Sequence, residues 1–427
     1  MSFDTAFYLS FFKKELKDNL LSFWMSRCLD TEYGGYLNCF TNAGDRLVSY
    51  DKYTWSQGRF LWTFSKLASC KTDAFKKQER ERFLEMAKNG RDFLLKNVLI
   101  APGDLRCVFL MERDGTPKYV EGCKELDMSI SADCFVVMGF AKYAEVSGDE
   151  ESYLFAKALF GSVWERYQSG NFKSLPYPIS PKYQSHARPM ILTNVICELF
   201  GAASRFDTPF LSELKEKLLK CHREVFEVFC DKDNLVHEFR LTGGDFPPNL
   251  FGGHINPGHT LEDMWFQTEA QEILGIHTYD EKIRRVVEST FRTGWDKEYG
   301  GLLHFVTCDG KGMTGKVGDA ADEPQMKLVL DDWGSKLWWV HSEALYTTLL
   351  TFDRTGDEAF QRDFETVFDY TFRTFPNPDR SIGEWIQIRT REGHPQEKVV
   401  ALPVKDPYHI IRNVVLIIEL LEKRIGR

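Results

Sequence analysis

The feature of this 427-residue chain that most limits its fold is a regular alternation of long and short connections between helical segments. Each odd-numbered segment is followed by a long connection, such as LRCVFLMERDGTP, and each even-numbered segment by a short one, such as SGDEE. This alternation predicts six helical hairpins. The twelve predicted helices span roughly 3–28, 52–70, 74–97, 128–146, 149–168, 187–205, 208–229, 259–274, 278–293, 335–354, 357–375 and 406–424.

The two sets of helices also differ in polarity. Even-numbered segments such as IIRNVVLIIELL are apolar on nearly every side, whereas odd-numbered segments such as LSELKEKLLKCHREVFEVF have one apolar stripe and one charged face. Six even helices inside a ring of six odd helices satisfy both patterns. We therefore predict an all-α fold, an (α/α)6 barrel, as one domain over residues 1–427, because no Pro/Ser-rich linker interrupts the chain. The long connections then gather at one end, around a central cleft.

A repeated phrase marks two of the long connections: DTEYGG begins at Asp30 and DKEYGG at Asp296. Each phrase is followed by a short alternating run that ends in a turn rich in Asn, Asp and Gly, a pattern typical of a β-hairpin. The diglycine is expected to adopt positive φ at this joint. We therefore expect short β-hairpins on the long connections.

Composition excludes several classes of function. The net charge of −9, with no basic block, argues against nucleic-acid and membrane-surface binding. The N-terminal segment is amphipathic and resembles neither a signal peptide nor a membrane span. Ten scattered cysteines without a CxxC pair argue against disulfides and a zinc site and favour the cytoplasm. Phosphate-binding loops and a nucleophile elbow are absent from the sequence, and we predict no metal site.

Unusual polar residues fall where the even-numbered helices begin, at the predicted cleft. They are Arg59, His259, His341 with Glu343, and His409 with Arg412. Each has an ordinary structural explanation: a buried histidine is usually a core or capping residue, Arg59 could form only a salt bridge, Asp406 could be an N-cap with Pro407 at the first helical position, and His186 could be a cap. Their common location at one end of the barrel nevertheless favours a functional site. Glu343, Glu384 and Asp332 near the rim leave a glycoside hydrolase open as an alternative.

Six stretches spread over residues 30 to 412 resemble the N-acylglucosamine 2-epimerase family, which includes the renin-binding proteins and is related to the cellobiose 2-epimerases and aldose–ketose isomerases. The stretches are DTEYGGYLNCF, DKYTWSQGRFLW, NPGHTLEDMWF, WDKEYGGLLHF, MKLVLDDWGSKLWWVHSEA and DPYHIIR. The resemblance implies an (α/α)6 barrel and a sugar 2-epimerase that interconverts N-acylglucosamine and N-acylmannosamine by proton transfer at C2 of the ring-opened sugar, through an enediolate.

Two further alternatives stay open. DPYHIIR is closer to the isomerase branch, which favours an aldose–ketose isomerase, or a 2-epimerase acting on mannose, glucose or a disaccharide. A non-catalytic binding protein is the other alternative.

The resemblance also implies roles for individual residues. It places the family's catalytic histidines at His259 and His409, its arginine at Arg59 and its acidic residue at Glu343. Histidine, with a pKa near 6.5, can exchange a proton with carbon at neutral pH when the enediolate is stabilised. This chemistry requires no cofactor, and the resemblance admits ATP as an allosteric activator and a homodimer. The residues expected to bind the sugar are Trp55, Arg188, Glu262, Trp339 and Trp385.

Overall fold

The computed structural model describes residues 3–426, so residues 1–2 and 427 of the predicted domain lie outside the described part. Its inner helices are α3 (Thr54–Ser69), α5 (Ile130–Ser147), α7 (Ala187–Phe206), α9 (Pro257–Leu274), α12 (Trp338–Thr355) and α14 (Tyr408–Ile425). The outer helices are α1 (Thr5–Lys14) continued by η1 (Glu15–Leu21) and α2 (Ser22–Arg27), α4 (Lys77–Asn97), α6 (Glu150–Ser169), α8 (Leu211–Glu224) flanked by η2 (Thr208–Phe210) and η3 (Val225–Phe229), α10 (Asp280–Gly294) and α13 (Glu358–Thr374).

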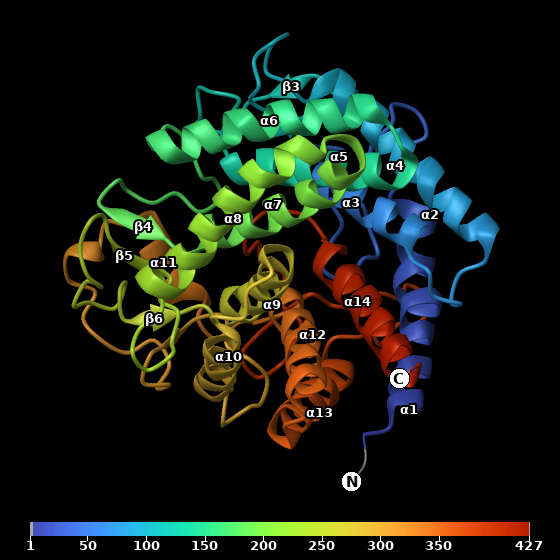
Figure 1. Cartoon of the computed structure of the whole chain (residues 1–427). Coiled ribbons are helices and arrows are strands. Elements are labelled where there is room, and N and C mark those ends of the chain that lie inside the picture. Colours follow the sequence, from blue (N-terminus) through green and yellow to red (C-terminus); the bar gives the residue numbers. More distant parts are fainter. Residues whose placement is uncertain (1–2, 427) are drawn as a thin grey trace.

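The six inner helices form a closed ring. Each packs against the next in sequence order, from α3 through α5, α7, α9 and α12 to α14, and α14 packs against α3. Each outer helix packs against its hairpin partner, and α1 lies beside α14, which brings the blue and red ends of the chain together in Figure 1. The predicted (α/α)6 barrel is confirmed.

Burial explains the difference in polarity between the two rings. In α5 nearly every residue from Ile130 to Ala144 is buried, because outer helices, neighbouring inner helices and the centre of the barrel surround it. In α10 only one face is buried, and its charged residues lie on the other face. Within residues 3–426, none of these helices is both long enough and apolar enough to cross a membrane.

Two helical features differ from the prediction. The first predicted helix is continuous only through a π-helical segment, η1, between α1 and α2. The connection from Gly301 to Lys336 contains η4 (Gly318–Ala320) and a short helix, α11 (Pro324–Asp332), where the sequence pattern predicts no helix. Nine residues give too few turns for a clear periodic pattern, which is why this helix was missed.

Short strands join neighbouring long connections at one end of the barrel. The run after the first diglycine forms the expected hairpin through the bridge between Phe40 and Leu47. The run after the second closes its turn with a backbone hydrogen bond from the Thr307 N–H to the Gly312 carbonyl, and its strand β7 also pairs with a strand of the preceding connection. The pairs are all antiparallel: β1 (Lys52–Tyr53) with β2 (Leu110–Met111), β2 with β3 (Pro117–Lys118), β4 (Tyr183–Ser185) with β5 (Phe239–Leu241), β6 (His254–Ile255) with β7 (Val306–Thr307), and β8 (Lys336–Leu337) with β9 (Ile388–Arg389).

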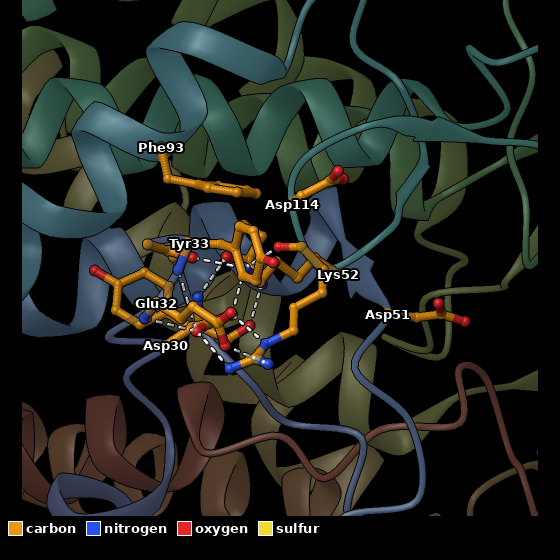
Figure 2. A network of polar contacts seen from close by, with 12 residues as sticks. Asp30, Glu32, Tyr33, Asp51, Lys52, Phe93 and Asp114 are labelled. Atoms are coloured by element: carbon orange, nitrogen blue, oxygen red, sulfur yellow. Dashed lines mark hydrogen bonds and ion pairs between the residues drawn. The ribbon is translucent and has the colours of Figure 1, made fainter.

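The first DxEYGG phrase is an ionic joint. The Asp30 carboxylate is fully buried and lies 3.0 Å from Nζ of Lys52, the residue that leads into α3. Arg113, from the next long connection, donates both Nε and Nη2 to Asp30. Figure 2 shows Lys52 reaching Asp30 below Phe93. The phrase thus ties an outer helix, an inner helix and the following connection together.

The second phrase repeats the same contacts. Lys336, before α12, lies 2.9 Å from Asp296, and Arg391 donates Nε and Nη2 to the same carboxylate. The glycines of both phrases have positive φ as predicted, between 72° and 82°. An added Cβ at Gly301 would lie 2.4 Å from the Tyr370 ring, so close packing also requires glycine there. The sequence repeat is therefore a repeated structural joint.

Candidate active site

A cavity opens at the end of the barrel where the inner helices begin. Its lining includes residues from the first turns of all six inner helices and from the long connections. Because the inner helices all point their N-termini towards it, the positive ends of six helix dipoles face the cavity, an arrangement that favours negative charge. Of the predicted site residues, the cavity is lined by Trp55, Arg59, Arg188, His259, Glu262, Trp339 and His409.

His259 lies in the first turn of α9, which Asn256 caps by accepting a hydrogen bond from the His259 backbone N–H. Its side chain is 22% exposed. Nδ1 lies 3.1 Å from both carboxylate oxygens of Glu238, and because a carboxylate only accepts, Nδ1 is the protonated nitrogen in this contact. Nε2 has no protein partner among the described residues.

His409 lies in the first turn of α14 with its side chain 7% exposed. Its Nδ1 is 2.7 Å from Oε1 of Glu343, and the same oxygen accepts a hydrogen bond from Nη2 of Arg412 at 2.6 Å. The other oxygen of Glu343, Oε2, accepts from the indole N–H of Trp265. Arg412 bridges Glu343 to Glu262 with the same nitrogen. Glu343 is fully buried beneath His409 and is not part of the cavity lining, so it positions the histidine and does not face the substrate.

The charged partners in these contacts shift the pKa values in the direction opposite to the effect of burial. Burial lowers the pKa of His259, but the carboxylates of Glu238, Glu262 and Asp263 together raise it, so the pKa lies above its ordinary value. Burial raises the pKa of Glu238, but His259 lowers it to about 2. Burial likewise raises the pKa of Glu343, but Arg412 and then His409 lower it below its ordinary value. Both carboxylates are therefore ionised at neutral pH.

Trp339 brings the two histidines into one site. Its ring centroid lies 5.3 Å from that of His259 and 5.6 Å from that of His409, which limits the separation of the two imidazoles to about 11 Å. Gly258 allows this packing, because a Cβ there would meet the Trp339 ring at 2.4 Å. Trp338, the preceding residue, also lines the cavity.

Trp385 was predicted wrongly as a cavity wall. It is fully buried, it donates its indole N–H to Oε1 of Glu15, and its ring stacks on Phe375. The part of the connection that carries Trp385 packs against the outer ring at η1, whereas Ile388 and Val400 farther along the same connection line the cavity. The expectation assumed that the whole of this long connection borders the cleft.

Arg59 lies at the cavity and is also ion-paired. One guanidinium nitrogen contacts Asp406, and the guanidinium packs over the rings of Phe135, at 4.1 Å, and Tyr408, at 4.9 Å. Nε of Arg59 has no partner among the described residues. Asp406 has the expected capping role as well, since its other oxygen accepts from the backbone N–H of Tyr408, although Pro407 itself occupies the N-cap position.

Arg188 and His304 complete the wall, and His186 lies outside it. Arg188 packs over the Phe172 ring at 4.6 Å and makes no hydrogen bond or ion pair among the described residues. His186 occupies the N-cap position of α7, but its side chain bonds to Asp263 and caps nothing. His304 lines the cavity with Nδ1 unpartnered, and burial followed by repulsion from His259 lowers its pKa to about 3, so it is neutral.

Sequence reasoning missed Glu238 and His304. Both lie on connections between helices, where no periodic pattern distinguishes them from other polar residues. His304 belongs to the run after the second DxEYGG phrase, which we interpreted only as a strand. Their importance depends on the side chains they meet across the barrel.

One group of side chains has the geometry of a metal-ligand set. Ligand atoms of Glu262, Glu343 and His409 lie within 4.8 Å of one another. The Nη2 atom of Arg412 already bonds to both carboxylates, so a fixed guanidinium supplies the positive charge that a metal ion would bring. These residues therefore do not fit a metal site.

The carboxylates that left a glycoside hydrolase open are not available at the cavity. None of the three lines it. Glu343 is bound by Arg412, Glu384 by Lys405 at 2.6 Å, and Asp332 by Lys398 at 2.6 Å. The geometry favours proton transfer by histidine over a pair of catalytic carboxylates.

Comparison with known proteins identifies the family. The family model for N-acylglucosamine 2-epimerase matches residues 35–413. The chain belongs to the N-acylglucosamine 2-epimerase family. The N-acylglucosamine 2-epimerase of Bos taurus is 30% identical over 419 residues, covering 96% of this chain and 90% of the relative. The cellobiose 2-epimerase of Ruminococcus albus is 22% identical over 414 residues, covering 94% and 96%.

The fold has the same relatives. The structure of cellobiose 2-epimerase from Bacillus thermoamylovorans B4167 superposes with a TM-score of 0.76 at 18% identity, covering 97% of this chain and 99% of that chain. The predicted resemblance is confirmed, and with it a sugar 2-epimerase, an enzyme of the isomerase class. The homologues of this epimerase family do not indicate a required cofactor.

Replacing Glu238 by Gln is expected to lower the pKa of His259. A neutral amide no longer stabilises the imidazolium, so the lowering effect of burial is less strongly opposed and the pKa falls. The limb of the pH profile of kcat/KM that reports His259 therefore moves to lower pH, whether His259 removes or supplies the proton. The measurement is kcat/KM for epimerisation between pH 5 and 9.

Glu224→Gln is the matched control, since Glu224 accepts from the Tyr167 hydroxyl and touches no histidine. Its profile should overlay that of the unmodified enzyme. A Glu238→Gln profile with both limbs unmoved would contradict the assignment of Glu238 as the partner of a reacting histidine.

Proposed function

We propose that this chain interconverts N-acylglucosamine and N-acylmannosamine by moving a proton at C2 of the ring-opened sugar. The observation that carries the proposal is the pair of cavity-lining histidines, His259 and His409, each held at Nδ1 by a buried carboxylate. Inversion requires a proton acceptor on one face of C2 and a proton donor on the other. Two histidines on different inner helices, both against Trp339, suit that requirement.

In the proposed reaction, Nε2 of one histidine removes the proton from C2. The electrons of the C–H bond form an enolate between C2 and C1, and negative charge develops on the C1 oxygen. The other histidine then delivers a proton to the opposite face of C2. Glu238 and Glu343 fix the tautomer of their histidines and stabilise the imidazolium that forms on proton transfer.

We assign stabilisation of the enolate to Arg59 and to the six helix N-termini around the cavity. Asp406 and the aromatic rings under the guanidinium hold Arg59 in place, so the cation is preorganised before substrate enters. A preorganised donor of this kind contributes about 3 kcal/mol to the transition state in comparable sites. Trp55, Glu262 and Trp339 would contact the sugar itself.

The N-acyl substrate is supported by two observations. The relative at 30% identity is an N-acylglucosamine 2-epimerase, whereas the cellobiose 2-epimerase is more distant at 22%. Arg188, a cavity cation without a protein acceptor, lies beside apolar Phe172 and Ile191. An acyl group offers a carbonyl for such a cation and a methyl group for such a wall.

The test is incubation with N-acetylglucosamine, N-acetylmannosamine, mannose, glucose and cellobiose in D2O, followed by NMR at C2. We expect interconversion of the two N-acetyl sugars with deuterium entering at C2. Conversion of mannose or glucose to a ketose would establish the aldose–ketose isomerase instead, and inversion of cellobiose the disaccharide epimerase. Absence of deuterium at C2 in all five sugars would refute proton transfer at C2.

Further properties follow from this proposal. The chemistry is proton transfer alone, so we propose that the chain acts without a cofactor, as one catalytic domain over residues 1–427. We also propose an amino-sugar function in the cytoplasm. The homodimer and activation by ATP stay predictions from the family resemblance.

A further inference from the structure

A cysteine and a histidine meet outside the cavity. Cys308 directly follows β7, and His237 lies on the connection between η3 and β5. The Sγ atom is 3.8 Å from Nδ1 and 4.0 Å from Nε2 of His237. Neither residue lines the cavity, and the proposed reaction uses neither of them.

The hydrogen bonds of His237 identify its charge. Nδ1 lies 2.7 Å from the backbone carbonyl oxygen of Gly252, and Nε2 lies 3.0 Å from Oδ2 of Asp231. Both partners are acceptors, so both ring nitrogens must donate, which makes the ring an imidazolium. Burial lowers the pKa of His237, but Asp231 and Cys308 raise it to about 10. A positive charge therefore lies about 4 Å from the sulfur at neutral pH.

The other cysteines have different surroundings. Most are buried among apolar side chains, and burial raises the pKa of the Cys39 thiol to about 12 and that of the Cys230 thiol to about 11. Cys308 and Cys123 are both partly exposed, but Cys123 contacts no imidazolium. Asp309, the acid next to Cys308, accepts from Thr307 and pairs with Lys311 at 3.0 Å.

We propose that Cys308 is a reactive nucleophile beside the His237 imidazolium, and that it is a site of oxidation by hydrogen peroxide. A thiolate beside a cation is the reactive form of cysteine. In the step, the sulfur attacks one peroxide oxygen, an S–O bond forms and the O–O bond breaks. The sulfur becomes a sulfenic acid by losing two electrons, and the other oxygen leaves as hydroxide and takes a proton from water.

Oxidation at Cys308 would act on the active site through the backbone. His237 is followed by Glu238, the partner of His259. The imidazolium holds the Gly252 carbonyl, and the Cys308 backbone N–H donates to the carbonyl of Gly253, which leads into β6 and the first turn of α9. The centroid of the Phe246 ring lies 3.8 Å from that of His237 in a stacked arrangement, so the imidazolium cannot move towards Phe246 when Cys308 is oxidised.

The first experiment measures reactivity without reference to catalysis. The full-length protein is treated with substoichiometric iodoacetamide at pH 7, and alkylation of each cysteine is followed by peptide mass spectrometry. We expect Cys308 to react at least about tenfold faster than Cys123, because thiolate is the attacking species. The His237→Gln variant, which keeps a hydrogen-bonding group but no charge, should reduce the rate at Cys308 to that at Cys123.

A second measurement keeps the test decisive if His237→Gln does not fold. Unfolding the unmodified protein in urea separates Cys308 from His237, so the ratio of the Cys308 alkylation rate to the Cys123 rate should fall to about one. Reaction of Cys308 no faster than Cys123 in the folded protein, or a ratio that urea leaves unchanged, would overturn the proposal.

The effect on activity rests on the proposed function and is measured separately. Hydrogen peroxide should form a sulfenic acid at Cys308 that dimedone traps, and epimerisation should slow several-fold in parallel. Cys308→Ser should keep its basal activity and become insensitive to peroxide. If dimedone labels Cys308 while no epimerisation exists to inhibit, the proposed function fails and the reactive thiol stands. If dimedone does not label Cys308, the oxidation site itself is refuted.

Discussion

Replacing either His259 or His409 by Asn is expected to lower the rate of net epimerisation by about a thousandfold, within the range for loss of a general acid or base. Inversion requires that a proton leave one face of C2 and that another reach the opposite face, so the two variants should be similarly inactive. An asparagine amide can keep a hydrogen bond to Glu238 or Glu343, which limits the structural disturbance. The measurement is the initial rate from each N-acetyl sugar.

The same two variants differ in deuterium exchange. With a given sugar in D2O, the variant that lacks the histidine facing the departing proton should exchange no deuterium at C2. The other variant should exchange it without inversion, by returning a deuteron to the same face. Starting from the opposite epimer should reverse the roles of His259 and His409.

His277→Asn is the control, because His277 is exposed and pairs only with Asp280. It should retain full activity. Near-native epimerisation by both active-site variants would exclude the histidines as the reacting groups. Loss of inversion with C1–C2 isomerisation retained in one variant would instead support the isomerase alternative.

Replacing Arg412 by Met is expected to produce the largest loss of stability. The guanidinium is buried between Glu262 and Glu343, and its removal leaves two carboxylates without their common partner. Breaking a buried ion pair from one side costs about 3 to 5 kcal/mol in the free energy of unfolding. Activity should fall as well, because Glu343 would no longer be fixed beneath His409.

The measurement is reversible urea unfolding at pH 7, compared with Arg412→Lys. Lysine keeps the charge but not the planar group that also donates to the Tyr408 hydroxyl, so its stability should be intermediate. Arg424→Met controls for the replacement of an arginine by methionine on the same helix, because the Arg424 side chain is 28% exposed. An Arg412→Met variant as stable as the unmodified chain would refute the bridging role.

The sequence by itself determined the barrel and the end that carries the site. Hydrophobic periodicity and the lengths of the connections are local properties, and together they specify which helices are inner and where these begin. The diglycines that begin at Gly34 and Gly300 predicted positive φ, because few residues other than glycine adopt it. His259 and His409 could be placed at one end for the same reason: each lies in the first turn of an inner helix.

Only the tertiary structure decided which side chains meet. Glu238 became the partner of His259, and Arg412 the bridge between two carboxylates, through contacts between segments far apart in the chain. Trp385 looked equivalent to Trp339 in sequence, yet its part of the connection packs against the outer ring. Periodicity fixes the direction in which a helical side chain points, but the path of a long connection depends on what it packs against, and that appears only once the barrel closes.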